Sequence, residues 1–183
     1  MIERPKTARY DSAAISLHWL VLGLIVAVYA AMLLRENFPR GSEIREGLKT
    51  WHYMLGLTVL ATALLRVALR AFVWKTPPIT PLPPLWQMWL AGAVHIALYT
   101  LMILMPIAGW LILSAEGEPI PLWGLSLPPL VPPDKALAEQ IKEVHEAIGT
   151  VGYFLIGLHA AAALYHHYVI RDNTVKRMLP GDN

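Results

Sequence analysis

Four long apolar stretches alternate with polar, charged or proline-rich segments along the chain. Three of them contain no Asp, Glu, Lys or Arg over 22, 30 and 24 residues, and these are Ala13 to Leu34, Leu85 to Ser114 and Ala147 to Ile170. A helix needs about 20 predominantly apolar residues to cross a bilayer. Each of the three stretches therefore predicts a transmembrane helix.

The remaining stretch has 16 uncharged residues, from Thr50 to Leu65, and is followed by Arg66 and Arg70. Extended to Trp74 it is long enough to span, because arginines near a helix end can extend their head groups to the interface. We predict an all-α fold, a four-helix transmembrane bundle forming a single membrane domain over residues 1–183. The helices are expected at approximately 13–34, 50–74, 85–114 and 145–170.

Composition supports this class and excludes several kinds of chemistry. The chain is 56% hydrophobic and 15% charged, whereas soluble domains have about 25% charged residues. A net charge of +2 gives no indication of nucleic-acid binding. The absence of cysteine excludes disulfides, zinc–thiolate sites, iron–sulfur clusters and haem attached through Cys-x-x-Cys-His. Metal chemistry would have to use His, carboxylate or Met.

The distribution of Lys and Arg predicts the orientation. The N-terminal segment, the end of the second helix with its following connection, and the C-terminal tail hold nine basic residues, and the other two connections hold six. Because cytoplasmic segments are enriched in Lys and Arg, both termini are expected to be cytoplasmic. The first stretch is longer than a typical signal-peptide core and has no A-x-A cleavage pattern, so we expect a membrane helix there.

Histidines fall at two depths in this arrangement. His52 and His145 lie near the outer starts of the second and fourth helices, and His18 lies near the inner start of the first. His159 follows His145 by 14 residues, which is close to four turns and roughly 21 Å of helix rise. His145 and His159 therefore share one side of the fourth helix, one at each depth.

The depths predict two pairs: His52 with His145 outside, and His18 with His159 inside. This is the arrangement that two bis-histidine b-type haems need, and Gly56, Gly149, Gly152 and Ala160 to Ala163 are placed to leave room for a flat macrocycle. Helix–helix hydrogen bonding is the alternative role for a membrane histidine. Zinc or copper would need three or four ligands at one depth. A proton or metal-ion carrier using a histidine pathway is a further alternative.

Three other histidines and two arginines could also take part. His95 lies at the inner depth and either replaces one ligand or, as we favour, forms hydrogen bonds nearby. His166 is two turns past His159 and could bind a propionate or a quinone head group, or be an ordinary interfacial residue like the adjacent His167. Arg66 and Arg70 share one helix face and could pair with haem propionates or act only as interfacial anchors.

Several motifs resemble the bacterial cytochrome b561 family over nearly the whole chain. They are LHWL around His18, WHYMLGL around His52, VHEAIGTVGYFLIGLHAAAALYHHY around His145 and His159, and the tail RDNTVKRMLP. The resemblance implies a dihaem cytochrome of the bacterial inner membrane that exchanges electrons with the ubiquinone pool. His18, His52, His145 and His159 match the family's axial ligands, and His166 matches a position that suggests quinone contact.

The resemblance to this family further implies a superoxide oxidase activity, in which electrons pass from superoxide through the haems to ubiquinone. We expect no general base or nucleophile, a lipid bilayer and ubiquinone as partners, and a monomer or homodimer. The outer connections have an excess of acidic residues, which would repel an anion unless Arg35, Arg40, Lys49, Lys135 or Lys142 form a local basic funnel. The alternative is a cytochrome b subunit that relays electrons from a dehydrogenase or hydrogenase to quinone.

Overall fold

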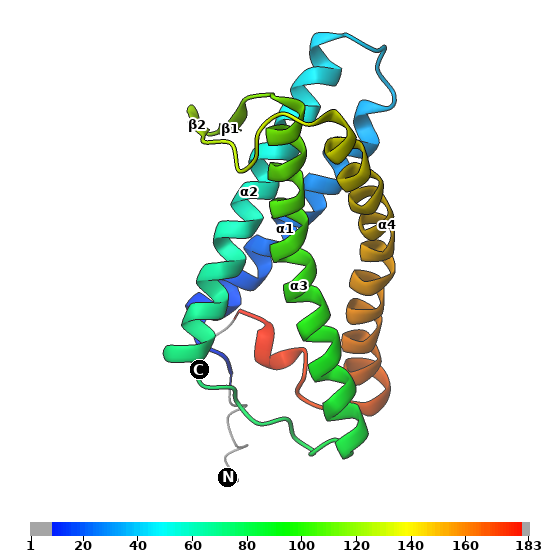
Figure 1. Ribbon diagram of the computed structural model, residues 1–183. Helices are drawn as coiled ribbons and strands as arrows, with labels where there is room; N and C mark the ends of the chain where they lie inside the picture. Colours follow the sequence, from blue (N-terminus) through cyan, green and yellow to red (C-terminus); the bar gives the residue numbers. More distant parts are fainter. Residues whose placement is uncertain (1–8, 181–183) are drawn as a thin grey trace, which may run out of the picture.

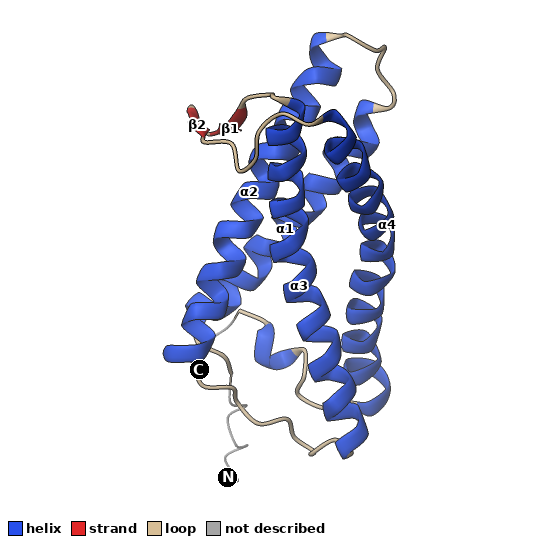
Figure 2. Cartoon of the chain, viewed as in Figure 1, coloured by secondary structure: helices blue, strands red, loops and turns tan. Residues whose placement is uncertain are grey.

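Four long helices make up most of the protein in the computed structural model, which describes residues 9–180. They are α1 (Ser12–Arg35), α2 (Glu43–Phe72), α3 (Leu85–Glu116) and α4 (Lys135–Tyr165), as Figures 1 and 2 show. Each is long and apolar enough to cross a membrane, and few residues of each apolar span are buried inside the protein. The prediction of four membrane helices is therefore confirmed.

Polar caps explain where the helices begin. The side chains of Asp11, Ser42 and Asp134 accept hydrogen bonds from the backbone N–H groups of Ala13, Arg45 and Leu137 at the starts of α1, α2 and α4. These residues are good N-caps because they satisfy N–H groups that lack a partner in the first turn. At the other end, Gly117 terminates α3 with a left-handed φ of 75°, a conformation that glycine adopts without strain.

Two helices begin earlier than the apolar pattern predicts. α2 starts at Glu43 and α4 starts at Lys135, so each begins several residues before its uncharged stretch. The charged lead-in segments continue the same helices because Ser42 and Asp134 provide the caps there. His145 consequently lies ten residues inside α4 rather than at its start.

The helices pack in two layers. α1 packs closely along α2, α3 packs along α4, and α2 contacts α3, whereas α1 and α4 barely approach each other through their backbones. Tyr29 of α1 bridges this space, since its hydroxyl donates to the carbonyl of Gly149 at 2.9 Å and its ring lies 4.3 Å from that of Tyr153. A side chain at Gly152 would collide with the Tyr29 hydroxyl. Gly152 therefore leaves room for the Tyr29 hydroxyl, and its role beside a macrocycle stays a prediction.

A short β-hairpin, which the all-α prediction missed, lies between α3 and α4. Its strands β1 (Ile120–Leu122) and β2 (Leu125–Leu127) pair antiparallel and project beside α2 in Figure 1. Trp123 and Gly124 form the turn with φ values of 48° and 87°, as two-residue hairpins require. The indole of Trp123 donates to the hydroxyl of Thr58 at 2.9 Å, and Ile120 joins a buried apolar cluster with residues of α2 and α3.

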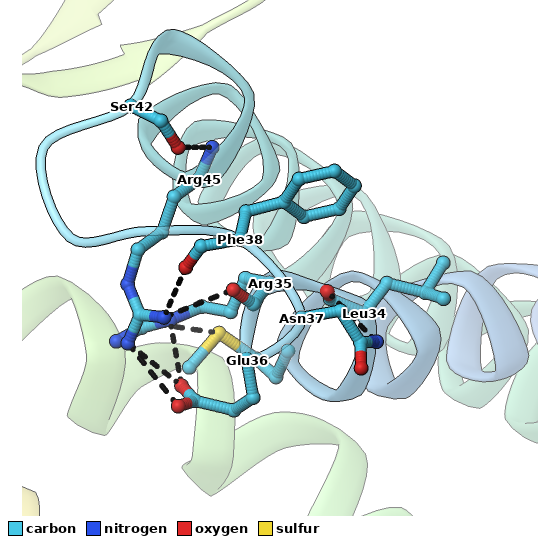
Figure 3. A network of polar contacts seen from close by, with 8 residues as sticks. Leu34, Arg35, Glu36, Asn37, Phe38, Ser42 and Arg45 are labelled. Carbon is cyan, nitrogen blue, oxygen red and sulfur yellow. Dashed lines mark hydrogen bonds and ion pairs between the residues drawn. The ribbon is translucent and has the colours of Figure 1, made fainter.

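The connection between α1 and α2 is organised by Arg45 (Figure 3). Its guanidinium donates to the carbonyls of Arg35 and Phe38, both at 3.0 Å. It also donates to both carboxylate oxygens of Glu36, at 3.0 and 3.2 Å. One partly buried side chain therefore satisfies a carbonyl at the end of α1 and another in the connection, and fixes the turn that leads into α2.

The chain after α4 folds back toward the end of the bundle where α1 begins. A π-helical turn, η1 (His166–Ile170), precedes a short 3₁₀ helix, η2 (Lys176–Met178). The backbone N–H of Asn173 donates to the carbonyl of Thr80 in the connection between α2 and α3, and the side-chain oxygen of Asn173 accepts from the N–H of Thr80. The backbone N–H of Tyr10 donates to the carbonyl of Arg177 at 3.2 Å. Both ends of the described chain thus lie at the same end of the bundle, although the side of the membrane stays a prediction.

Candidate functional site

His52 on α2 and His145 on α4 face each other at the end of the bundle near the β-hairpin. Their ring centres are 6.3 Å apart and their planes are inclined by 72°. The Nδ1 atom of His52 lies 3.1 Å from the carbonyl oxygen of Val28 on α1. Because a carbonyl only accepts hydrogen bonds, this contact puts the proton on Nδ1 and leaves Nε2 as a free ligand atom.

A cavity of about 560 Å³ lies around these two rings and is lined by residues from all four helices. Gly56, Gly109 and Gly149 contribute to the lining. A methyl group at Gly56 would meet no atom within 4 Å, and at Gly109 it would lie 3.7 Å from Cε1 of His145. The volume is within the range of cofactor pockets, which is about 300–1,000 Å³. The small residues therefore keep open the space that a large planar ligand needs.

Charged side chains of both signs line the cavity. Arg35, Lys49 and Lys142 are the basic ones, and Glu36, Glu46, Glu116 and Glu146 are the acidic ones. Glu36 is paired with Arg45 and with Arg35, whose nearest nitrogens lie at 3.0 and 3.2 Å. Three of the five basic residues singled out in the sequence thus gather at one opening, beside acidic residues of which Glu36 is neutralised.

A second histidine pair with a similar ring separation lies toward the opposite end of the bundle. His18 on α1 and His159 on α4 have ring centres 6.3 Å apart and planes inclined by 64°. His95 on α3 lies nearer to His159, at 5.5 Å between ring centres. The side chain of His95 is exposed, whereas those of His18 and His159 are partly buried.

The two equal separations can be compared with the requirement of metal ligation. A nitrogen–metal bond of about 2.0 Å on each side, with roughly 1.1 Å from each nitrogen to its ring centre, separates two opposed rings by about 6.2 Å. Both pairs match this value with 6.3 Å, and the 5.5 Å between His95 and His159 is too short. The ring separations of the pairs His52–His145 and His18–His159 are therefore compatible with a haem held between the two imidazoles of each pair.

Two further observations bear on the kind of ligand. Nδ1 of His145 is buried and has no hydrogen-bond partner among the described residues, so its ring is held by packing alone. Within residues 9–180, no three or more His, Cys, Asp or Glu side chains are arranged to hold a bare metal ion.

Arg66 and Arg70 lie on α2 near the inner histidines. Arg66 donates to the carbonyl of Ala14 on α1 at 3.1 Å. Its charge acts on His18 and His95, and that of Arg70 acts on His95. Arg66 thus lies close enough to His18 to meet an anionic group of a ligand bound there, and Arg70 lies near His95.

His166 has a partner that the sequence did not indicate. Its Nδ1 lies 2.5 Å from Oδ2 of Asp172, a residue that is only 2% exposed. The backbone N–H of Thr174 donates to Oδ1 of Asp172 at 2.8 Å. Burial raises the pKa of this carboxyl, but the hydrogen bonds from His166 and Thr174 lower it more, so the net pKa lies below its usual value. His167, in contrast, turns toward Tyr168, with ring centres 4.7 Å apart.

Sequence comparisons agree with these features. A family model described as prokaryotic cytochrome b561 matches residues 9–181. The chain is 37% identical to "Cytochrome b561 homolog 1" of Escherichia coli (strain K12), over 94% of this chain and 97% of that protein. It is 36% identical to "Probable superoxide oxidase CybB" of Yersinia pestis, over 94% and 96%. "Cytochrome b561 homolog 2" of Escherichia coli (strain K12) is 29% identical over 93% and 91%.

Proposed function

Since the chain belongs to the prokaryotic cytochrome b561 family, a family that implies b-type haem, we propose that it is a dihaem electron carrier of the bacterial inner membrane. His52 and His145 are the proposed axial ligands of an outer haem, and His18 and His159 those of an inner haem. Each bound haem supplies a one-electron redox couple at its depth. The chain's own residues bind the two groups, fix their orientation and keep lipid and water away.

One observation carries this proposal above the others. Two histidine pairs that share no residue have the same ring separation of 6.3 Å, which is what a linear nitrogen–iron–nitrogen arrangement requires. A direct hydrogen bond between the two imidazoles of a pair would bring their nitrogens within about 3 Å and their ring centres closer than the 6.3 Å found in both pairs. A proton pathway would also not need a cavity of about 560 Å³ around one pair.

We further propose that superoxide is the electron donor on the outer side and that ubiquinone is reduced on the inner side. The relative named as a probable superoxide oxidase supports the donor. Arg35, Lys49 and Lys142 at the cavity opening can attract an anion locally, although the acidic residues beside them oppose this attraction. With both termini cytoplasmic, the outer pair is the one that an external donor reaches.

On the inner side, Arg66 and Arg70 are proposed to pair with propionates of the inner haem, and His166 is proposed to contact the quinone head group. Arg66 keeps guanidinium hydrogens free beyond its bond to Ala14, so it can hold an anion as well. His166 follows His159 by seven residues and is the first residue of η1, which leads into the tail that bonds to the α2–α3 connection through Asn173 and Thr80.

The proposal is tested with haem-loaded protein in ubiquinone-containing vesicles. Superoxide generated outside should reduce haem in a stopped-flow experiment, followed by quinone reduction, and His52→Ala should abolish the first step. Pyridine-haemochrome assay should give about two haems per chain. A colourless folded protein would contradict the cytochrome proposal itself.

A red protein that superoxide does not reduce would retain the cytochrome and reject the donor. The chain would then act as a subunit that relays electrons from a partner dehydrogenase or hydrogenase, and such a partner should co-purify with it. Analytical ultracentrifugation distinguishes the monomer from the homodimer, both of which are compatible with the proposed electron path.

A further inference from the structure

The end of α4 departs from regular helix geometry where His166 and Asp172 meet. η1 (His166–Ile170) is a π-helical turn, and Arg171 after it has a left-handed φ of 60°. Both conformations are uncommon for ordinary residues, and π-helical turns occur frequently at functional sites. Together they turn the chain back so that the Asp172 carboxylate reaches the His166 ring.

Hydrogen bonding determines the protonation pattern of this pair. The carboxylate of Asp172 also accepts from the Thr174 N–H, and its lowered pKa keeps it ionised near neutral pH. An ionised carboxylate can only accept hydrogen bonds. Nδ1 of His166 must therefore carry the proton of the 2.5 Å contact, and Nε2 is the nitrogen that remains available to a ligand.

The surroundings of the pair are polar and buried. Oγ1 of Thr174 and Nε of Arg177 are buried with no partner among the described residues. Buried polar atoms of this kind normally bond to water or to a ligand. The charged and titratable groups around the pair are Tyr165, whose ring is 6.2 Å from that of His166, and Arg177, which acts on Asp172 and stacks on Tyr10.

We propose that Asp172 is a positioning residue that holds Nδ1–H of His166, so that Nε2 exchanges a proton with a carbonyl oxygen of the quinone. This inference rests on the proposed quinone contact of His166 and adds the residue that directs it. Reduction of one quinone consumes two electrons, delivered through the haems, and two protons. Nε2–H of the imidazolium gives one proton to one oxygen, water gives the other, and Asp172 balances the positive charge that the ring carries beforehand.

The reverse reaction provides a test that needs no knowledge of the physiological donor. Ubiquinol-1 added to the oxidised, haem-loaded protein loses two electrons to the haems and two protons, one of them to Nε2. Haem reduction is followed in the α-band at several quinol concentrations, in H2O and in D2O. Haem content and the two α-bands of every variant are recorded first, so that only intact proteins are compared.

Asp172→Asn should lower the maximal rate about tenfold or more, the usual effect of losing a partner that orients a functional histidine, with KM changed less than about twofold. The solvent isotope effect should increase, because proton transfer then limits the rate. Asn173→Ala is the matched control: it removes the bonds to Thr80 and Pro78 but leaves the His166–Asp172 contact, and should react at the wild-type rate.

The outcomes separate this inference from the proposed quinone site. If His166→Ala is slow and Asp172→Asn is normal, quinone contacts His166 and the role of Asp172 is wrong. If Asp172→Asn and Asn173→Ala are equally slow, Asp172 only docks the tail, and the inference is also overturned. A wild-type rate in His166→Ala would show that the quinone does not bind at His166. It would reject both the proposed quinone contact and the role of Asp172.

Discussion

Replacing His52 with alanine is expected to remove the outer haem and leave the inner one. The two proposed sites share no ligand, because His52 pairs with His145 while His18 pairs with His159. The side chain of His52 also provides the bond to the Val28 carbonyl, and its loss therefore frees that carbonyl as well. Haem content should decrease from about two to about one per chain.

The size of the effect follows from the geometry. In His52→Ala the iron would keep only His145, whose Nδ1 has no hydrogen-bond partner among the described residues, and would face a methyl group across the cavity. Loss of a residue that merely orients a ligand lowers metal affinity 10–100-fold, so loss of the ligand itself should exceed the upper value. A 100-fold loss corresponds to about 2.8 kcal/mol.

The assay combines the pyridine-haemochrome reaction with low-temperature spectra of the reduced protein. One α-band should disappear and the other should keep its position, and His145→Ala should lose the same band. His18→Ala should lose the opposite one. Two haems per chain with unchanged six-coordinate spectra in His52→Ala would refute the pairing, and so would loss of the inner band alone.

Four further changes have defined outcomes. His95→Ala should retain two haems and shift only the inner α-band by a few nanometres, since that ring is a neighbour and not a ligand; loss of a haem in the reduced spectrum would contradict the inner assignment. Gly56→Leu should fold, because a methyl there meets nothing within 4 Å. Its side chain should fill the cavity, so the haemochrome assay should show loss of the outer haem. The control Gly92→Leu should retain both haems. Arg45→Ala should lower the thermal unfolding midpoint, because it removes charged hydrogen bonds with a net contribution of at most about 1.5–3 kcal/mol each, and less for those to the exposed Glu36; an unchanged midpoint would show that the turn is held by other contacts. Since the pKa of Asp172 is lowered in the folded protein, its carboxylate contributes stability at neutral pH that is lost as the pH decreases below about 3.8 and through the lowered pKa, and Asp172→Asn should show a smaller loss in acid unfolding.

The large features of this protein could be predicted because they depend on regular periodicity. Apolar stretches of more than about 20 residues indicate membrane helices, and the regular rise of α4 places His145 and His159 on one side at two depths. The helix starts were less accurate, because Ser42 and Asp134 begin helices in charged segments that the apolar pattern does not include. The polar caps themselves were the signal that would have located these starts.

The β-hairpin, the His166–Asp172 contact and the surroundings of Gly152 depend on tertiary contacts or backbone conformations that no local sequence pattern predicts. The β-hairpin contains a single Gly and is held by Trp123 reaching Thr58 on another element. Asp172 reaches His166 only because Arg171 adopts a left-handed conformation, which is uncommon for a residue of that type. The contact between Gly152 and the hydroxyl of Tyr29 on α1 could not be predicted either, because the stripe of small residues along α4 says nothing about α1.

The separation of α1 from α4 has a consequence for biogenesis. α1 and α2 pack against each other and are the first two spans to leave the ribosome, so their imidazoles enter the bilayer without counterparts. α4 supplies one member of both pairs and is translated last. If the proposed ligand pairs are correct, neither haem site is complete before α4 is in place, and a chain truncated before α4 should insert into the membrane but remain colourless.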